Sequence, residues 1–295
     1  MADAMLLHPD TSARVSGYTA QPSQALLLIG PAGSGKDSLA LHLSADLLGT
    51  DISLVEGYAY RTVVEPAADK ASIGIEAVRE LQHVAMLKLP ADASRRIIIV
   101  RQAHTLTAEA QNALLKLLEE PPRNTHFILL AESEQQLLAT IRSRAQTLVM
   151  HRPDRFTVLR YFGQKGYDEQ TISQAYSLSG GMPGLMYALL GAADHPLRQS
   201  VALARQVLQG TQFVRLSLVD GLSKDKSGAL QLLFVLQQMS RAAIEQSAAA
   251  DTADRPARPQ IERWHKVLHA SYEAQEAYAV SAQAKLTLTH LMLSI

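Results

Sequence analysis

The sequence predicts an α/β domain built on a parallel sheet, followed by a region that is entirely helical. Short apolar runs typical of buried strands alternate with segments of helical spacing across residues 24–150, and a glycine-rich turn follows the first run. After about Arg152 no segment has the pattern of a strand. Alternating strands and helices are typical of a parallel sheet that carries helices on both faces.

The first expected strand, Gln24–Ile29 (QALLLI), ends at a glycine, and helical spacing continues over Leu39–Leu48. The intervening stretch GPAGSGK, residues 30–36, fits the phosphate-loop pattern G-x-x-x-x-G-K in the strand–turn–helix context that the pattern requires. In such a loop the glycines let backbone N–H groups surround phosphate oxygens, and the lysine reaches the outer phosphates. We therefore predict a phosphate loop by descent; a tight turn with a surface lysine is the alternative.

This loop departs from its pattern at one position. Residue 37 is Asp where the motif has Ser or Thr as a magnesium ligand, and a carboxylate beside a triphosphate is repelled. Ser38 takes over that ligand role only after a shift of one residue. The sequence leaves open whether ATP or ADP still binds. The candidate nucleotide-binding residues are Gly30, Gly33, Gly35, Lys36 and Ser38.

A helix and a second buried strand follow. Apolar residues recur at intervals of three and four over 71–89, which predicts an amphipathic helix that ends before Pro90. The apolar run Ile97–Val100 is expected to be a strand, and it stops at Arg101-Gln102-Ala103-His104. Phosphate-loop NTPases carry a magnesium-binding Asp on such a strand. Arg101 would oppose a magnesium ion rather than bind it, and His104 fits the start of a helix better than a catalytic base.

The next helix has clear start and stop signals. Thr107 is a suitable N-cap, and apolar residues form one stripe from Ala110 to Leu118. Pro121 and Pro122 end this helix. The run FILLA that follows, Phe127–Ala131, predicts a third buried strand.

The remaining chain predicts helices only. Their expected ranges are Gln170–Ser179, Pro196–Gln209, Gly228–Ser247 and Ile261–Leu293. The stretch SGGMPG (Ser179–Gly184) is a break, and Ala248–Gln260 is expected to be a polar loop that contains prolines. The helix over Gly228–Ser247 is apolar on all sides, which indicates burial on several sides. Partner subunits or its own domain can provide that burial, and the sequence does not decide between them.

Composition excludes several classes of site. The 295 residues include 28 Lys plus Arg, 28 Asp plus Glu and no Cys, which rules out disulfides, thiolate zinc sites and a cysteine nucleophile. The balanced charge and the single Trp disfavour a free DNA-binding module with a basic face or a stacking platform. The N-terminus has neither a basic segment nor a long apolar run, so we expect a cytoplasmic protein with no membrane contact.

Two stretches carry a specific family resemblance. NALLKLLEEPP (Asn112–Pro122), followed by TIRSRAQ (Thr140–Gln146), resembles the clamp-loader branch of the AAA+ ATPases, and within it the subunits of the bacterial DNA polymerase III clamp loader. Three weaker stretches extend the resemblance over nearly the whole chain: SIGIEAVREL (72–81), SLSGGMPG (177–184) and the terminal AQAKLTLTHLMLSI.

The resemblance implies a three-part organisation. Residues 1–152 are expected to form a degenerate AAA+ nucleotide-binding domain, with a RecA-like parallel sheet flanked by helices. A small helical lid over 153–200 and an all-helical collar domain over 201–295 are expected to follow, the collar serving oligomerisation.

The resemblance also gives a role to Arg144. In the family a Ser-Arg-Cys motif places its arginine at a subunit boundary, against the ATP of the neighbouring subunit. Arg144 occupies that place here, with Ala145 where cysteine is usual. Arg142 is the nearest competitor for the role, and a plain surface arginine is the alternative.

Several further departures from the family pattern also indicate that the contacts to a nucleotide are impaired. Pro183 stands where ATP-hydrolysing relatives carry a lid arginine, and Ala131-Glu132 replaces the polar residue expected after the FILLA strand. Only about 23 residues precede the first strand, so the resemblance implies that the adenine-binding segment is expected to be shortened. Gly49–Pro66 runs where bacterial relatives carry a cysteine-rich zinc module.

The resemblance therefore implies a stator subunit that completes a ring of ATPases, supplies Arg144 in trans and does not hydrolyse ATP itself. The expected partners are the ATPase subunits (gamma/tau) and the delta subunit, with the sliding clamp and primer–template DNA contacted through the assembly. No cofactor or metal, zinc included, is expected to be required. The alternative is a self-sufficient AAA+ ATPase of DNA metabolism, which needs carboxylates at a strand end. Glu119 and Glu120 do not supply them, because these two residues lie at the far end of the helix that begins at Thr107. At 1.5 Å per residue, that end is on the order of 15 Å away.

Overall fold

The structure is a computed structural model that describes residues 5–67, 70–90, 93–190, 197–249, 258–279 and 283–295. It consists of two compact units, Met1–Arg152 and Pro153–Ile295, and each is described by itself. No helix in the described ranges is long and apolar enough to span a bilayer.

The first unit is built on a five-stranded sheet in which every neighbouring pair of strands is parallel. The strand order is β2-β3-β4-β1-β5. The three strands expected from the sequence are confirmed as β1 (Ala25–Ile29), β3 (Arg96–Val100) and β4 (Thr125–Ala131). The two edge strands, β2 (Arg61–Val64) and β5 (Gln146–Val149), were not predicted as strands.

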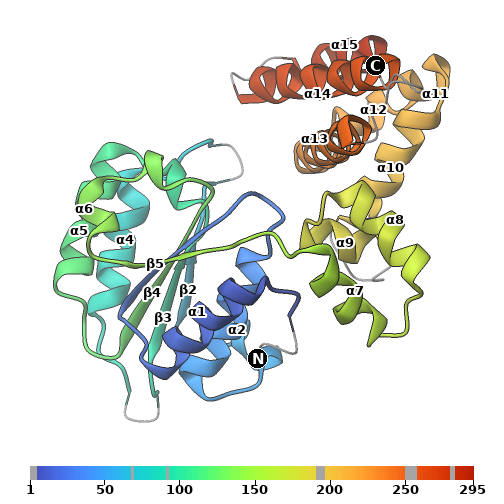
Figure 1. Cartoon of the computed structure of the whole chain (residues 1–295). Helices are drawn as coiled ribbons and strands as arrows, with labels where there is room; N and C mark the ends of the chain where they lie inside the picture. Colours follow the sequence, from blue (N-terminus) through green and yellow to red (C-terminus); the bar gives the residue numbers. More distant parts are fainter. Residues whose placement is uncertain (1–4, 68–69, 91–92, 191–196, 250–257, 280–282) are drawn as a thin grey trace. The chain divides into compact units, whose positions relative to one another are not determined.

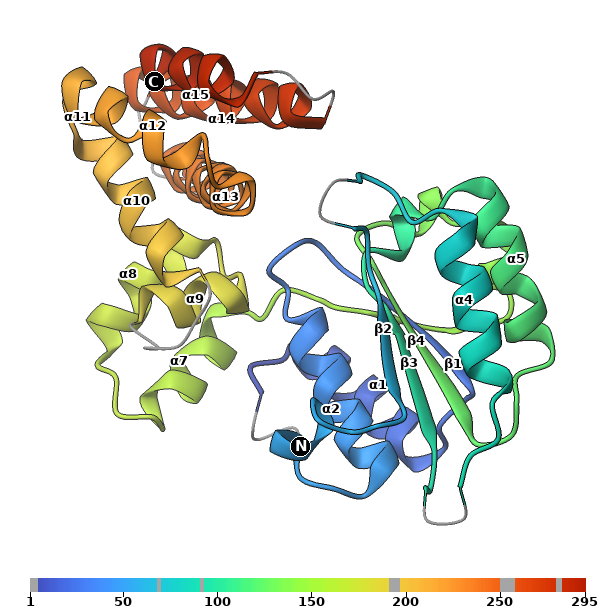
Figure 2. The ribbon, with the colours of Figure 1, turned by 180° about the vertical axis from the view of Figure 1, so that it is seen from behind.

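Helices cover both faces of this sheet, as the sequence predicts (Figures 1 and 2). On one face α4 (Ile75–Met86) and α5 (Ala108–Glu119) share a core with Leu27 of β1. On the other face α1 (Pro9–Ala20) and α2 (Lys36–Leu48) share a core with the adjacent residue Leu28. Successive residues of a strand point to opposite faces, so continuous apolar runs are what a doubly covered sheet requires.

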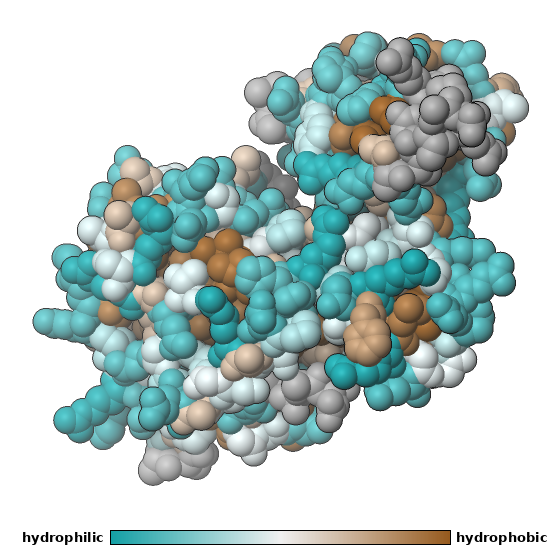
Figure 3. Space-filling view, viewed as in Figure 1, coloured by the Kyte–Doolittle hydropathy of each residue, from teal (hydrophilic) through white to brown (hydrophobic). Residues whose placement is uncertain are grey.

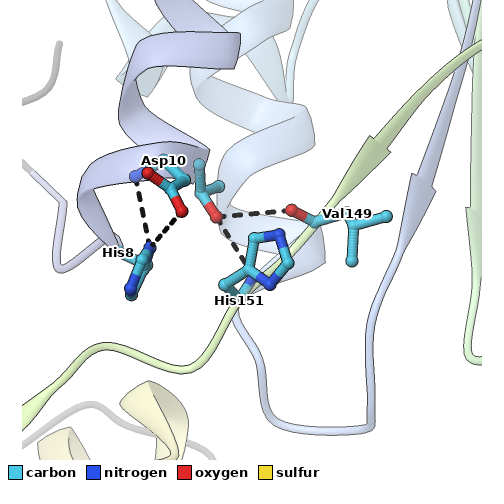
Figure 4. A network of polar contacts seen from close by, with 5 residues as sticks. His8, Asp10, Val149 and His151 are labelled. Atoms are coloured by element: carbon cyan, nitrogen blue, oxygen red, sulfur yellow. Dashed lines mark hydrogen bonds and ion pairs between the residues drawn. The ribbon is translucent and has the colours of Figure 1, made fainter.

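Helix α1, which the sequence did not reveal, is tied to the end of β5 (Figure 4). Thr11 is fully buried, its hydroxyl donates to the Val149 carbonyl at 3.3 Å, and it accepts from the His151 N–H at 3.0 Å. His8 caps the helix by accepting from the Asp10 N–H at 3.2 Å, and its ring centroid lies 5.6 Å from that of His151. These contacts hold the N-terminal helix against an edge strand of only four residues.

The short elements of the first unit lie in its connections. Helix α3 (Ile52–Val55) precedes β2. The 3-10 helices η1 (Ala103–Thr105) and η2 (Glu134–Gln136) follow β3 and β4, and α6 (Ala139–Arg142) precedes β5. Thr107 caps α5 as predicted, because its hydroxyl accepts from the Ala110 N–H at 3.2 Å.

The second unit is helical throughout its described part, as predicted. The expected helix over 261–293 is in fact two helices, α14 and α15, and α7, α9, α11 and α12 were not predicted. The break at Ser179–Gly184 is confirmed, and most of the expected loop Ala248–Gln260 lies outside the described residues. The helices are α7 (Arg155–Gly163), α8 (Glu169–Ser179), α9 (Pro183–Leu189), α10 (Arg198–Gln209), α11 (Gln212–Ser217), α12 (Val219–Leu222), α13 (Lys226–Ala249), α14 (Arg258–Ala279) and α15 (Ala284–Ser294).

One continuous core runs through most of the second unit. It joins Leu185 of α9 and Val201 of α10 to Leu232 of α13, Val267 of α14 and Leu291 of α15. The all-round apolarity of α13 is thus accounted for within its own unit, where it packs against α8, α10 and α14. The division into a lid over 153–200 and a collar over 201–295 stays a proposal.

Some large apolar side chains are exposed in the described part of the chain. The face in Figure 3 is mostly hydrophilic, with small separate apolar patches. Phe213 on α11 and Leu286 and Leu293 on α15 are exposed by 82%, 65% and 51%. Residues 286 and 293 are seven apart, which places them on the same side of α15, and α11 packs against that helix.

We predict that the first unit loses stability as the pH falls. Burial lowers the pKa of His126 in β4, Arg95 adds to the effect, and the hydrogen bond to the Ser23 carbonyl opposes it. Below the ordinary histidine pKa of about 6.5 the unfolded chain therefore takes up a proton that the folded chain excludes. The melting temperature should fall between about pH 7.5 and about pH 5.5.

The fall should be smaller in His126→Asn, which retains an N–H donor but does not titrate. His83→Asn, at an exposed position on α4, is the control and should keep the full pH dependence of the wild type. An identical fall in wild type and His126→Asn would show that His126 is not responsible.

Candidate functional site

The phosphate loop joins β1 to α2 in the geometry that its sequence predicts. The Gly30 N–H donates to the Ala131 carbonyl at 3.1 Å. A Cβ atom at Gly30 would lie 2.8 Å from Cβ of Met150 and 2.9 Å from Oγ of Ser34, so a larger residue does not fit without a shift. Gly35 begins α2 with φ of 90°, a conformation that strongly favours glycine.

Lys36 is bound by the loop itself. Its side chain is buried, and Nζ donates to the carbonyls of Gly30 and Pro31, the latter at 2.9 Å. Burial lowers the pKa of Lys36, while Glu132 and Asp37 oppose that change. The ammonium group would have to leave these carbonyls to reach an outer phosphate.

The position of the expected magnesium site holds an ion-pair network. Nε of Arg101, at the end of β3, lies 2.9 Å from Oδ1 of Asp37, and Nη1 lies 3.1 Å from Oε2 of Glu65. A phosphate-loop site that binds magnesium has a hydroxyl residue directly after the loop lysine, here residue 37. It also has a carboxylate at the end of a neighbouring strand, here residue 101. Here the two positions carry a carboxylate and a guanidinium that are paired with each other. These residues do not fit a magnesium ion.

The residues around this pair add further negative charge. Lys36 and Arg101 bring two positive charges, whereas Asp37, Glu65 and Glu132 bring three negative ones, a net of −1. One feature still suits an anion: Oγ of Ser34 is buried in the loop without a hydrogen-bond partner among the described residues. The loop therefore keeps a feature that suits a phosphate anion, whereas the residues at the magnesium position do not suit a metal ion.

His104 is the middle residue of the short helix η1 and not the first residue of a helix, and α5 begins only at Ala108. Its Nδ1 accepts from the Glu132 N–H at 3.3 Å. Burial lowers the pKa of His104, Lys36 adds to the effect, and Glu132 opposes it. Ser38 is exposed on α2, and its carbonyl lies 2.8 Å from Nδ1 of His42. The structure does not bring Ser38 into the network of Asp37 and Arg101.

Arg144 lies in the short connection between α6 and β5. Its Nη2 is 2.7 Å from Oε1 of Glu119, the last residue of α5. Its Nη1 donates to the Thr140 carbonyl at 3.1 Å and to the Ser143 hydroxyl at 3.3 Å. The Arg144 side chain is 35% exposed, so it is held by these contacts and remains partly accessible.

The two neighbours of Arg144 that the sequence singled out are placed differently. Arg142 is the last residue of α6, and its Nε is buried without a hydrogen-bond partner in the described structure. Ala145 is buried in the core beneath α4 and α5. Pro183 begins α9 in the second unit.

Gln111 positions the segment that carries Arg144. Its buried side chain donates to the carbonyls of Leu106 and Gln136, both at 3.1 Å, and accepts from the Leu138 N–H at 2.7 Å. Leu138 is the N-cap of α6, so one side chain of α5 fixes the start of that helix.

The sequence did not identify Glu65, Gln111 or Glu119 as parts of these networks. Glu119 was considered only as a candidate catalytic acid, yet a carboxylate at the negative end of a helix is disfavoured by the helix dipole. That placement favours a nearby cation, and it is the only signal in the sequence for the pairing of Glu119 with a basic residue such as Arg144. Gln111 is polar within a helix whose neighbouring positions form the apolar stripe. Glu65 follows a strand that was itself not predicted.

Comparison with known proteins gives consistent relatives. A family model described as "DNA polymerase III, delta subunit" matches residues 15–154. The DNA polymerase III subunit delta' of Escherichia coli (strain K12) is 30% identical over 244 residues, which are 76% of this chain and 71% of that protein. The subunit delta' of Pseudomonas aeruginosa is 29% identical over 201 residues, which are 63% of this chain and 61% of that protein, less than two thirds of its length.

A solved structure of a DNA polymerase III gamma subunit-related protein from Thermotoga maritima is also similar. It superposes with a TM-score of 0.49 at 19% identity, over 95% of this chain and 97% of that one.

We predict that Gln111→Ala destabilises the first unit. The substitution leaves the Leu138 N–H and two carbonyls without their partner, and stranding such groups costs about 1–3 kcal/mol. Urea unfolding of the full chain measures the difference. Asn112→Ala, at the exposed adjacent position, is the matched control and should change stability by less than about 0.5 kcal/mol. Equal effects of the two substitutions would contradict a structural role for Gln111.

Proposed function

The chain belongs to the DNA polymerase III delta' family of clamp-loader subunits, and from that premise we propose that it acts as a stator. In this role it completes a ring of ATPase subunits, does not hydrolyse ATP itself and donates Arg144 to the ATP of a neighbour. The assembly as a whole loads the sliding clamp onto primed DNA during replication.

The observation that supports this proposal most strongly is the pair formed by Asp37 and Arg101. Hydrolysis in phosphate-loop NTPases depends on a magnesium ion that bridges the phosphates and neutralises developing charge. A guanidinium bound to the carboxylate at residue 37 leaves no ligand pair for that ion. The neighbouring carboxylates Glu65 and Glu132 further oppose a polyanion. We therefore propose that the loop residues Gly30, Gly33, Gly35, Lys36 and Ser38 are vestigial.

The second line of support is the placement of Arg144. Its side chain is partly exposed, which action on another subunit requires. An arginine finger supplied by a neighbour raises turnover by about 10³ to 10⁵ in NTPases. A subunit without its own hydrolysis can thus control the hydrolysis of the next one.

The proposed partners follow from the family. They are the gamma/tau ATPase subunits and the delta subunit, with the sliding clamp and primer–template DNA reached through the assembly in the cytoplasm. We propose that residues 201–295 form the collar that joins these subunits. The exposed side chains of Phe213, Leu286 and Leu293 support this, since large apolar groups on a surface favour burial against a partner.

The alternative function, a self-sufficient ATPase, requires a carboxylate where Arg101 stands. Glu119 does not supply it, because that carboxylate is paired with Arg144. No cofactor, zinc included, enters the proposed role.

We predict that the isolated chain has no ATPase activity, because the charges of Asp37 and Arg101 are directed to each other instead of to a metal ion. Phosphate release from ATP with magnesium should not exceed that of Lys36→Ala, measured in the same preparation. Phosphate release above this control would contradict the prediction and show that the protein hydrolyses ATP itself.

We also predict that Arg144→Ala lowers the DNA-stimulated ATPase of the reconstituted clamp loader. Turnover at the neighbouring site should fall on the order of 10³-fold, because the interaction is strongest in the transition state. Co-elution of the subunits should be unchanged. Arg144→Lys should rescue little, since an ammonium lacks the planar fork of the guanidinium.

Arg142→Ala serves as the comparison, because it removes an equal charge two residues away. A larger loss for Arg142→Ala than for Arg144→Ala would transfer the role to Arg142. Unchanged turnover in both variants would leave Arg144 a surface arginine and refute the trans role.

A further inference from the structure

We infer that Glu119 is the positioning residue of Arg144, holding its guanidinium in one orientation before a neighbouring subunit is engaged. The inference rests on the proposed trans role of Arg144 and adds to it a second residue of the same site. Glu119 and Arg144 are 25 residues apart in the chain, so only the fold brings them together.

The geometry fixes the guanidinium from two elements. Glu119 on α5 lies 2.7 Å from Nη2, while the Thr140 carbonyl and the Ser143 hydroxyl hold Nη1 at 3.1 Å and 3.3 Å. In the described part of the chain these contacts use three of the five N–H groups of the guanidinium. Two N–H groups remain for an oxygen ligand on the exposed side.

Glu119 has no other evident structural task. It is the last residue of α5, where the helix dipole disfavours a carboxylate, and the turn is closed by the backbone N–H of Glu120, which donates to the Lys116 carbonyl at 3.2 Å. The carboxylate is 47% exposed, so it does not fill the core. Among the described residues, its one ion pair is with Arg144.

The contact is also the second of two by which α5 holds the segment that carries Arg144. Gln111, near the start of this helix, holds the N-cap of α6, and Glu119, at its end, holds the residue that follows α6 by two positions. The short segment that carries Arg144 is thus anchored to α5 at both ends. A long arginine side chain has many rotamers in water, and a fixed charge partner reduces the ordering that remains when it meets a ligand.

The test uses Glu119→Ala and the matched control Glu120→Ala, which removes an equal charge at the adjacent exposed position. Both variants are incorporated in the reconstituted clamp loader with the other ATPase sites inactivated, and kcat and KM for ATP are measured with primed DNA. We expect Glu119→Ala to lower kcat about 10-fold with KM and co-elution unchanged, and Glu120→Ala to stay within about 2-fold of the wild type. Glu119→Gln keeps an acceptor oxygen without the charge, so its kcat should lie between that of Glu119→Ala and that of the wild type.

A second comparison shows whether Glu119 acts through Arg144. In the Arg144→Ala background, Glu119→Ala should cause no further loss, because the group that it positions is gone. A further loss of similar size would overturn the inference. A rise in kcat for Glu119→Ala would also overturn it, because the ion pair would then inhibit turnover.

The failure of this inference is distinguishable from failure of the proposed function. If Arg144→Ala lowers turnover while Glu119→Ala matches Glu120→Ala, the finger stands and the positioning role is wrong. If Arg144→Ala itself has no effect, the trans role falls and the inference falls with it.

Discussion

The ion pair of Asp37 and Arg101 is the contact on which the account of this protein depends. Either residue alone would be unfavourable in a working nucleotide site, because a carboxylate repels phosphate and a guanidinium repels magnesium. Together, at 2.9 Å, they satisfy each other and tie the start of α2 to the end of β3. Glu65 at the end of β2 joins the same guanidinium, so three segments of the parallel sheet domain meet at one side chain. These ion pairs give the two side chains a structural role within the domain, in place of the metal-binding role that we propose has been lost.

Under the proposed stator role, the metal position is lost and the rest of the domain is kept, so a phosphate-loop fold would serve without hydrolysing ATP itself. The loop still turns on Gly30 and Gly35, and Lys36 is retained as a buried donor to its own loop. The opposite face of the sheet carries α5, from which Gln111 and Glu119 hold the segment of Arg144. In the proposed role, the sheet and α5 together support Arg144, the group that acts on the neighbouring subunit.

Much of this fold could be predicted because its central elements are fully buried. The strands β1, β3 and β4 are continuous apolar runs, and α4 and α5 carry clear stripes, so local pattern and burial agree. The edge strands β2 and β5 have only four residues each and are partly exposed, which leaves no distinctive pattern. The ion pairs were not predictable, since Glu65 and Arg101 are 36 residues apart and meet only through the sheet register. Arg101 and Asp37 were recognised as departures, but their pairing required the structure.

The most direct test is nucleotide binding to the wild type and to the double variant Asp37→Thr/Arg101→Asp, each with and without magnesium. The variant restores a hydroxyl and a carboxylate at the two exchanged positions. We expect wild-type affinity for ATP or ADP to be independent of magnesium, and the double variant to gain affinity when magnesium is added. A wild-type affinity that rises about tenfold or more with magnesium, a change of about 1.4 kcal/mol, would show that the ion pair does not replace the metal site.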